Sequence, residues 1–194
     1  MSLRSRTPSR MARALCLALL TLGGTAFAVP MPPGGVGTPH GQTAAGTPSL
    51  AGVVVQDKVI PFDCGAAFHG TLQSRVVRSN SLGTLDFYYR IINDATSVNG
   101  IRLVRAVDFS QAPTADADYR LDGSGTAAPS LITRVEASGD LVNFAFDDSP
   151  IDPGESSRLF YVRSGRTNYD AAGGIYITDS FTTCVVHETF RPLP

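Results

Sequence analysis

Four acidic side chains fall within nine consecutive positions, in a stretch that also contains two prolines. Hard cations such as Ca²⁺ bind roughly six to eight oxygen ligands at flexible distances, and the carboxylates of one loop can supply several of them. The spacing fits no known calcium-loop formula, and Asp and Pro are also ordinary turn residues. The stretch therefore predicts either a calcium site or a solvated turn. The four acids are Asp147, Asp148, Asp152 and Glu155.

A second group of acids, Asp116, Asp118 and Asp122, is spaced almost like the opening of an EF-hand loop. Arg120 occupies a position where that loop needs a ligand, and Ala127 stands where the loop needs its closing glutamate. No helical pattern flanks the group. The sequence therefore excludes an EF-hand here, and one edge of an irregular metal site remains as an alternative.

Two histidines lie close in sequence to two cysteines. His69 follows Cys64 by five residues, and His187 follows Cys184 by three. A bond between the cysteines would bring the histidines near each other, and a Zn²⁺ or Cu²⁺ site that used both would need a further ligand. The alternative is that each histidine is exposed or hydrogen-bonded on the face of a strand. Available further ligands are Asp57, Asp63 and Glu188, and a third histidine is His40.

Motifs of nucleophilic and zinc-dependent catalysis, such as G-x-S-x-G, S-x-x-K and H-E-x-x-H, do not occur in the sequence. His187 and Glu188 open the last of these, but Arg191 stands where its second histidine belongs. Glycine-rich phosphate cradles are also missing. Carboxylate pairs for glycoside hydrolysis are set by distance in space and not by sequence. No catalytic residue is predicted, and a small secreted hydrolase or metal-dependent enzyme remains an alternative.

Several tyrosines are candidates for exposed aromatic surfaces on which the rings of a sugar could stack. Tryptophan is the usual platform for such stacking, and the chain contains none. Tyrosine at the edge of a strand more often packs its ring and keeps its hydroxyl in water. Glycan binding therefore remains an alternative function, and no residue is assigned to it. The tyrosines concerned are Tyr88, Tyr161, Tyr169 and Tyr176.

Composition limits the class of protein. The chain has 194 residues, of which 43% are hydrophobic and 17% charged, and its formal net charge is −1. There is enough apolar material for one domain with a core, which excludes a disordered polyelectrolyte. The charge balance excludes a strongly basic nucleic-acid binder.

Residues 1–28 predict a signal peptide. Four arginines precede an apolar run at residues 14–22, which is too short to span a bilayer, and small residues at 26 and 28 predict cleavage between Ala28 and Val29. Removal of this segment leaves 12 cationic against 17 acidic side chains, a formal charge of −5. No later segment is apolar for long enough to cross a membrane. We expect a secreted protein, with the periplasm as the alternative location.

Cysteine usage agrees with export. Cys16 leaves with the signal peptide, and Cys64 and Cys184 remain as an even pair in an oxidising compartment. A bond between them would close a loop of about 120 residues, which is worth on the order of 4–5 kcal/mol in the chain-entropy account. We therefore predict a structural disulfide, and a catalytic or metal-binding thiol is the alternative.

Residues 29–51 are rich in Pro, Gly, Thr and Ala and carry no formal charge, which predicts a flexible leader. The folded domain is expected over residues 52–190, followed by a short tail at 191–194.

A period of two dominates the predicted domain, and such alternation indicates half-buried strands. In residues 84–92, one face carries Leu85, Phe87, Tyr89 and Ile91, and the other carries Asp86, Tyr88 and Arg90. Turn residues separate the strands. The pattern predicts an all-β, antiparallel two-sheet sandwich of immunoglobulin-like type, with a jelly roll or closed barrel as the alternative. Further strands are expected at 53–60, 68–78, 101–109, 131–137, 141–146, 158–163 and 174–188, the last with a break near Asp179.

Four runs of the sequence resemble a family of uncharacterised secreted bacterial domains that often occur in proteins with a PEP-CTERM sorting tail. The resemblance implies an exported all-β domain, and it assigns no catalytic or binding residue. The chain ends without the Val-Pro-Glu-Pro motif, apolar helix and basic cluster of that tail, so anchoring by that route is not expected. The runs are GTLDFYYRIINDA (83–95), ADYRLDGSGTAAPSLITR (117–134), SPIDPGESSRLFYVRS (149–164) and TNYDAAGG (167–174).

These patterns together predict a non-catalytic extracellular module that interacts with a partner or belongs to the cell envelope or matrix. An extracellular protein or a glycan is the expected kind of partner, and nucleic acid is not. A calcium- or glycan-binding module is the first alternative.

Overall fold

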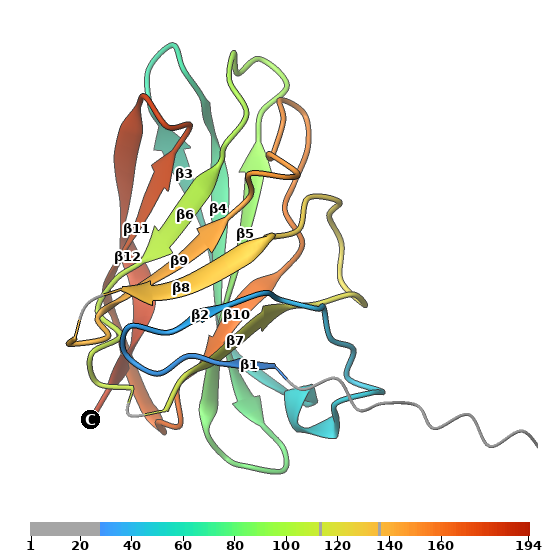
Figure 1. Cartoon of the computed structure of the whole chain (residues 1–194), viewed down its shortest axis with the longest axis vertical. Coiled ribbons are helices and arrows are strands. Elements are labelled where there is room, and N and C mark those ends of the chain that lie inside the picture. The colour runs from blue at the N-terminus through green and yellow to red at the C-terminus, as the bar shows by residue number, and fades with distance from the viewer. Residues whose placement is uncertain (1–27, 113, 136) are drawn as a thin grey trace, which may run out of the picture.

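The computed structural model describes residues 28–112, 114–135 and 137–194, and it contains two six-stranded sheets packed face to face (Figure 1). All strand pairs are antiparallel. The predicted two-sheet sandwich is therefore confirmed, while its immunoglobulin-like type stays a prediction. The predicted signal peptide lies outside the described residues except for Ala28.

The two sheets are named sheet 1 and sheet 2. In spatial order, sheet 1 consists of β1 (Val29–Pro30), β7 (Asp116–Tyr119), β10 (Phe160–Arg163), β5 (Leu85–Asn93), β4 (His69–Ser79) and β3 (Gly52–Asp63). Sheet 2 consists of β12 (Thr183–Leu193), β11 (Asn168–Thr178), β6 (Leu103–Ala106), β9 (Leu141–Ala145), β8 (Leu131–Val135) and β2 (Val36–Gly37). One 3₁₀ turn, η1 (Pro48–Leu50), precedes β3. In the described part of the chain no helix is long and apolar enough to cross a membrane.

The core forms where the inner faces of the two sheets meet. The alternation predicted for residues 84–92 is confirmed in β5, whose four inward apolar side chains are almost completely buried. Across the core, Phe144 of β9 in sheet 2 packs at a tilt against Phe160 of β10 in sheet 1, with ring centroids 4.6 Å apart. Buried aromatic pairs of this kind add about 0.5–1.5 kcal/mol beyond the area that they bury. Alternation with a period of two thus decides which side chains of β5 face the core, although the outward side chains of Asp86 and Tyr88 are also buried.

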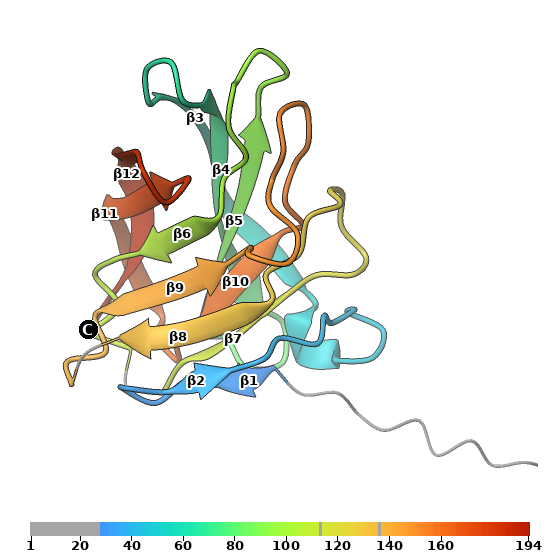
Figure 2. The same ribbon diagram turned by 45° about the horizontal axis from the view of Figure 1, so that its top comes forward.

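The segment predicted to be a flexible leader is folded, and so that prediction is wrong. Residues 28–51, which we call the N-terminal strap, run past both sheets (Figure 2). Its strand β1 pairs with β7 at the edge of sheet 1, and its strand β2 pairs with β8 at the edge of sheet 2. Met31 and Leu50 are buried. The composition is misleading because the strap needs no core of its own: it gains backbone hydrogen bonds and apolar burial from the sandwich.

A buried arginine fastens the strap to the loops beside it. The Arg134 guanidinium is almost completely inaccessible, and it donates hydrogen bonds to the carbonyl oxygens of Met31 (3.0 Å), Phe109 (2.9 Å), Ala112 (2.7 Å) and Gly139 (2.7 Å). Gly139 has a φ of +65°, and a Cβ there would lie 2.6 Å from the Arg134 Nε. Glycine is therefore required at that turn both by its backbone and by the guanidinium packed on it.

A buried carboxylate fastens the strap at a second point. Asp118 of β7 has no exposed surface, and its Oδ1 accepts hydrogen bonds from the backbone N–H groups of Gly41 (2.8 Å), Tyr119 (2.8 Å) and His40 (3.2 Å). Its Oδ2 accepts one from the Gln42 side chain at 3.3 Å. Backbone N–H groups that converge on a carboxylate replace the water that it loses on burial.

The opposite side of the sandwich is closed by covalent and polar contacts between β3 and β12. The predicted disulfide is confirmed: it joins Cys64, just after β3, to Cys184 in β12, at a sequence separation of 120. Lys58 of β3 forms an ion pair with Glu188 of β12 at 2.6 Å. Edge strands with unpaired backbone groups invite aggregation, and this closure protects both of them.

The domain boundary predicted at residue 190 is also wrong. Strand β12 continues to Leu193, and Pro192 and Leu193 lie opposite Tyr169 and Asn168 of β11. Residues 191–193 therefore belong to sheet 2. Proline is tolerated there because β12 is an edge strand, where one face of the backbone needs no N–H donor.

Replacing Arg134 by Met should lower the free energy of unfolding by about 3–5 kcal/mol, because four buried carbonyl oxygens lose their donor. Urea denaturation of the two proteins measures the difference. Arg102→Met is the matched control, since Arg102 is exposed, and its effect should stay within about 0.5 kcal/mol. Equal effects of the two substitutions would contradict the anchoring role of Arg134.

Reduction of the Cys64–Cys184 bond should lower the free energy of unfolding by about 4–5 kcal/mol, since the bond closes a long loop in the unfolded chain. Denaturation curves with and without reductant measure this loss. In a Cys64→Ser, Cys184→Ser double variant, reductant should have no effect. If the wild type is just as indifferent to reductant, the bond does not form in solution.

Candidate functional site

The predicted calcium loop is an exposed turn between β9 and β10. Asp147, Asp148, Asp152 and Glu155 are all exposed. The turn is held through its backbone, where Asn93 N–H donates to the Glu155 carbonyl at 3.0 Å. Among the described residues no group of three or more His, Cys, Asp or Glu side chains is placed to hold a metal ion. Calcium binding at this loop stays a prediction.

The second acidic group is divided among structural contacts. Asp118 anchors the strap, whereas the Asp122 carboxylate accepts hydrogen bonds from Arg120 at 2.7 and 2.8 Å and from the Ala44 N–H at 2.9 Å. The hydrogen bonds from Arg120 lower the pKa of Asp122 to about 2. Asp116 is half-buried beside Arg163, and burial raises its pKa. Within the described residues these carboxylates belong to no group of three or more His, Cys, Asp or Glu side chains that could hold a metal ion.

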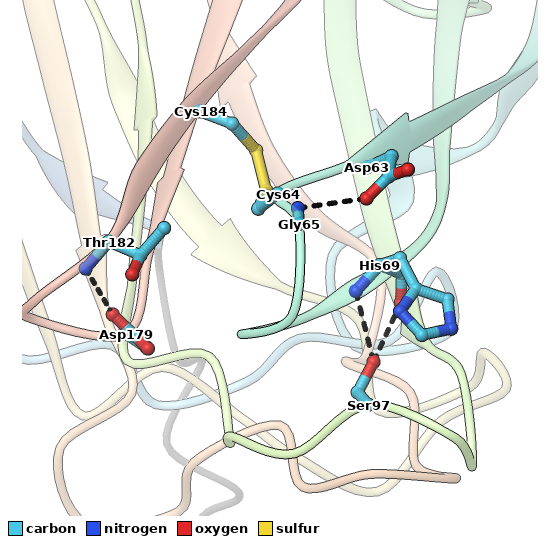
Figure 3. The surroundings of a disulfide bond; sticks show 8 residues. All are labelled: Asp63, Cys64, Gly65, His69, Ser97, Asp179, Thr182 and Cys184. Atoms are coloured by element: carbon cyan, nitrogen blue, oxygen red, sulfur yellow. Dashed lines mark hydrogen bonds between the residues drawn. A yellow bond between two sulfur atoms is a disulfide. The ribbon is translucent and has the colours of Figure 1, made fainter.

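The two histidines have different surroundings, and His69 lies near the disulfide (Figure 3). His69 exchanges hydrogen bonds with Ser97 through its backbone, and its Nε2 lies 2.8 Å from the Thr96 hydroxyl and 4.0 Å from the Asp94 carboxylate. His187 is exposed on β12, opposite Gly174. Of the two alternatives, one histidine is hydrogen-bonded and the other exposed, and within the described residues no group of three or more His, Cys, Asp or Glu side chains is placed to hold Zn²⁺ or Cu²⁺.

The predicted outward tyrosines are mostly covered. Tyr88 and Tyr161 do lie on the outer face of sheet 1, but they are buried there with Leu50 of the strap. Their ring centroids are 5.1 Å apart. The exposure expected for these two rings is therefore wrong, because the strap covers them. Tyr169 packs edge-on against Phe190, and Tyr176 remains 40% exposed.

Beside this covered patch, the outer face of sheet 1 is hollowed into a groove of about 690 Å³, which we call the outer groove. Outward side chains of β4 and β5 form its floor, and the segment after β7 forms a wall. Cross-strand register brings the floor together, since Gln73 lies opposite Arg90 and Arg75 lies opposite Tyr88. The lining residues are Gln73, Arg75, Val77, Tyr88, Arg90, Arg120, Asp122, Gly123, Ser124 and Leu159.

Two of the three arginines in the groove are held by carboxylates. Arg75 donates to Asp57 Oδ2 at 2.6 and 3.0 Å. Arg120 is paired with Asp122 and also donates to the Tyr88 hydroxyl at 3.3 Å, with its guanidinium carbon 5.9 Å from the centroid of that ring. These contacts fix both side chains and neutralise their charges locally.

Arg90 is different. Its Nη2 donates to the Ser156 hydroxyl at 2.8 Å, and its Nε is buried without a hydrogen-bond partner. Within the described residues, no acidic side chain forms an ion pair with Arg90. The groove therefore contains one positive charge that the protein itself leaves uncompensated. Buried donors without partners are rare in native proteins, and this one lies beneath the surface of the groove.

A buried carboxylate lies on the same outer face, one register row beyond Tyr88. Neither oxygen of Asp86 has a hydrogen-bond donor, and the nearest cation, the Arg163 Nε, is 3.7 Å away. Burial raises the pKa of Asp86 from 3.8 to about 7, although Arg163 and Arg120 oppose this shift. The buried hydroxyl of Tyr161 also lacks a partner. Asp86 is thus neutral for part of the physiological pH range.

The sequence contained part of the signal for this site. Alternation in residues 84–92 assigned Asp86, Tyr88 and Arg90 to the outer face, and that assignment is correct. The register between the consecutive strands β4 and β5 could not be read from it, because alternation does not state which residues lie opposite each other. The position of Arg120 after β7 could not be read either, because it depends on pairing between distant segments.

Comparison with family profiles, curated proteins and solved structures finds no match to this chain. The site is therefore interpreted from its own geometry.

The free energy of unfolding should decrease as pH rises, because Asp86 loses its proton at a higher pH in the folded protein than in the unfolded chain. The folded state holds the proton up to about pH 7, while the unfolded chain releases it near pH 4, so the free energy of unfolding falls as pH rises between these values. Asp86→Asn should remove this decline and make the protein more stable than wild type above pH 7. Denaturation curves from pH 4 to 8 measure it.

The matched control for that series is Asp148→Asn, which changes an exposed carboxylate. Its stability profile should run parallel to that of the wild type. A parallel profile for Asp86→Asn as well would mean that Asp86 titrates normally in the folded protein.

Proposed function

We propose that this chain is an exported, non-catalytic binding module of the bacterial cell envelope or extracellular matrix. The observation that carries the proposal is the outer groove, with Arg90 uncompensated between two arginines that are fixed by carboxylates. Groups held rigidly before a ligand arrives lose little entropy when it binds. A groove whose side chains are fixed in advance is therefore suited to recognise and bind a ligand.

The chemistry of the groove favours binding over catalysis. Its one carboxylate, Asp122, has a pKa of about 2 and so holds no proton to donate near neutral pH. Efficient acid–base catalysis needs a group with a pKa near the working pH. The other polar groups are guanidinium, amide and hydroxyl groups, which orient a ligand by hydrogen bonding.

Export is supported by two independent features. The Cys64–Cys184 disulfide is compatible with an oxidising compartment, where such bonds persist. The predicted signal peptide and the resemblance to secreted bacterial domains point to the same location. Ala28 is buried and Val29 begins β1, so cleavage between them would leave the strap starting at its first paired residue.

Expression of the full chain with a C-terminal tag in a bacterium, followed by fractionation, tests this proposal. We expect the protein outside the cytoplasm, beginning at Val29 and disulfide-bonded, with saturable retention on isolated envelope or matrix. A chain lacking residues 1–28 should stay in the cytoplasm and serves as the control. Cytoplasmic wild-type protein, or exported protein that no envelope or matrix preparation retains, would contradict the proposal.

A further inference from the structure

The starting observation is the charge balance inside the outer groove. Arg75 and Arg120 already share their charges with Asp57 and Asp122, so one unneutralised guanidinium, that of Arg90, faces the groove. Its Nε is buried, so a ligand in the groove can reach this guanidinium only through its terminal nitrogens. A carboxylate is the acceptor that matches a guanidinium in charge and geometry.

The surroundings of Arg90 are those of a hydroxyl-rich ligand. Gln73 and Ser124 line the groove, and because the Gln73 Nε2 already donates to both Asp57 oxygens, at 2.9 and 3.0 Å, Gln73 has its amide oxygen left to accept from a ligand hydroxyl. The Ser124 hydroxyl can donate or accept, and the exposed Asp122 can accept hydrogen bonds from a ligand hydroxyl. The aromatic ring in the floor, that of Tyr88, is almost completely buried, so a large apolar side chain would find little free surface. The volume of about 690 Å³ lies within the range of small-molecule sites, about 300–1,000 Å³.

We propose that the outer groove binds an acidic saccharide, with Arg90 holding the carboxylate of a uronic acid unit and Gln73, Ser124 and Asp122 contacting hydroxyl groups. This inference rests on the proposed function and names the ligand class of that module. One uncompensated charge matches one carboxylate, whereas a phosphate would bring more negative charge than the groove balances. The formal charge of −5 after signal removal repels densely charged polymers, which favours a saccharide with sparse carboxylates.

Calorimetric titration of the exported chain with a disaccharide of glucuronic acid linked to glucose tests the proposal. The glucosyl-glucose disaccharide that lacks the carboxylate is the neutral comparison, and it should bind at least tenfold more weakly. Arg90→Ala should weaken binding of the acidic disaccharide about tenfold or more, because it removes a hydrogen bond to a charged group. Arg90→Lys keeps the charge without the planar edge and should lie between the two.

Two further variants keep the result interpretable. Arg102→Ala removes an exposed arginine outside the groove and should leave the affinity unchanged. If Arg90→Ala fails to fold, Ser124→Ala tests the wall of the same groove and should weaken binding of both disaccharides severalfold, since it removes a contact to a hydroxyl group.

Several outcomes would overturn the assignment. Binding of inorganic phosphate as tight as that of the acidic disaccharide would mean a simple anion site, and preference for a glutamate-containing tripeptide would mean a peptide site. Equal affinities of Arg90→Ala and wild type would place the ligand elsewhere. An exported chain that the matrix retains but that binds no uronate would refute this inference alone, whereas a chain that is neither exported nor retained would refute the proposed function.

Discussion

Two buried charges hold the N-terminal strap against the sandwich, and most other features of the structure depend on them. Arg134 binds four backbone carbonyl oxygens, and Asp118 accepts hydrogen bonds from three backbone N–H groups. Neither charge is neutralised by direct pairing with the opposite charge. The dipoles of backbone N–H and C=O groups stabilise both charges instead. Because these groups have fixed positions, Arg134 and Asp118 also determine where the strap lies. Isolated buried charges are costly, and these are tolerated because their hydrogen-bonding groups are satisfied.

The strap and the disulfide close opposite sides of the same sandwich. β1 and β2 cover one edge of each sheet, while Cys64–Cys184 and the Lys58–Glu188 pair connect the edges on the other side. The strap also shapes the outer groove, since the Ala44 N–H binds Asp122 and the Leu50 carbonyl accepts a hydrogen bond from Arg120 at 3.4 Å. The strap thus holds the wall residues Arg120 and Asp122 in place. These residues are distant in sequence from the β4 and β5 residues of the floor.

The sequence predicted those parts of the fold that depend on local pattern. Alternation in residues 84–92 identified β5 and both of its faces, and the break near Asp179 separates β11 from β12, where Asp179 binds the N–H groups of Phe181 and Thr182. Prediction failed where distant segments meet. The strands β1 and β2 of the strap and the strand β7 are short and are stabilised by the strands beside them. Tyr88 is buried by the strap, which its composition predicted to be flexible. The outer groove depends on register, which no local pattern encodes.

Hydrogen exchange of the backbone amides in residues 28–51 tests most directly whether the strap is part of the fold. The structure predicts protection at Met31, Gly41 and Gln42, whose N–H groups bind the Ala115 carbonyl, the Asp118 carboxylate and the Tyr119 carbonyl. These amides should exchange about as slowly as the amides of β5. Exchange at the rate of an unstructured chain, while β5 stays protected, would show that the strap is detached and that the sandwich stands without it.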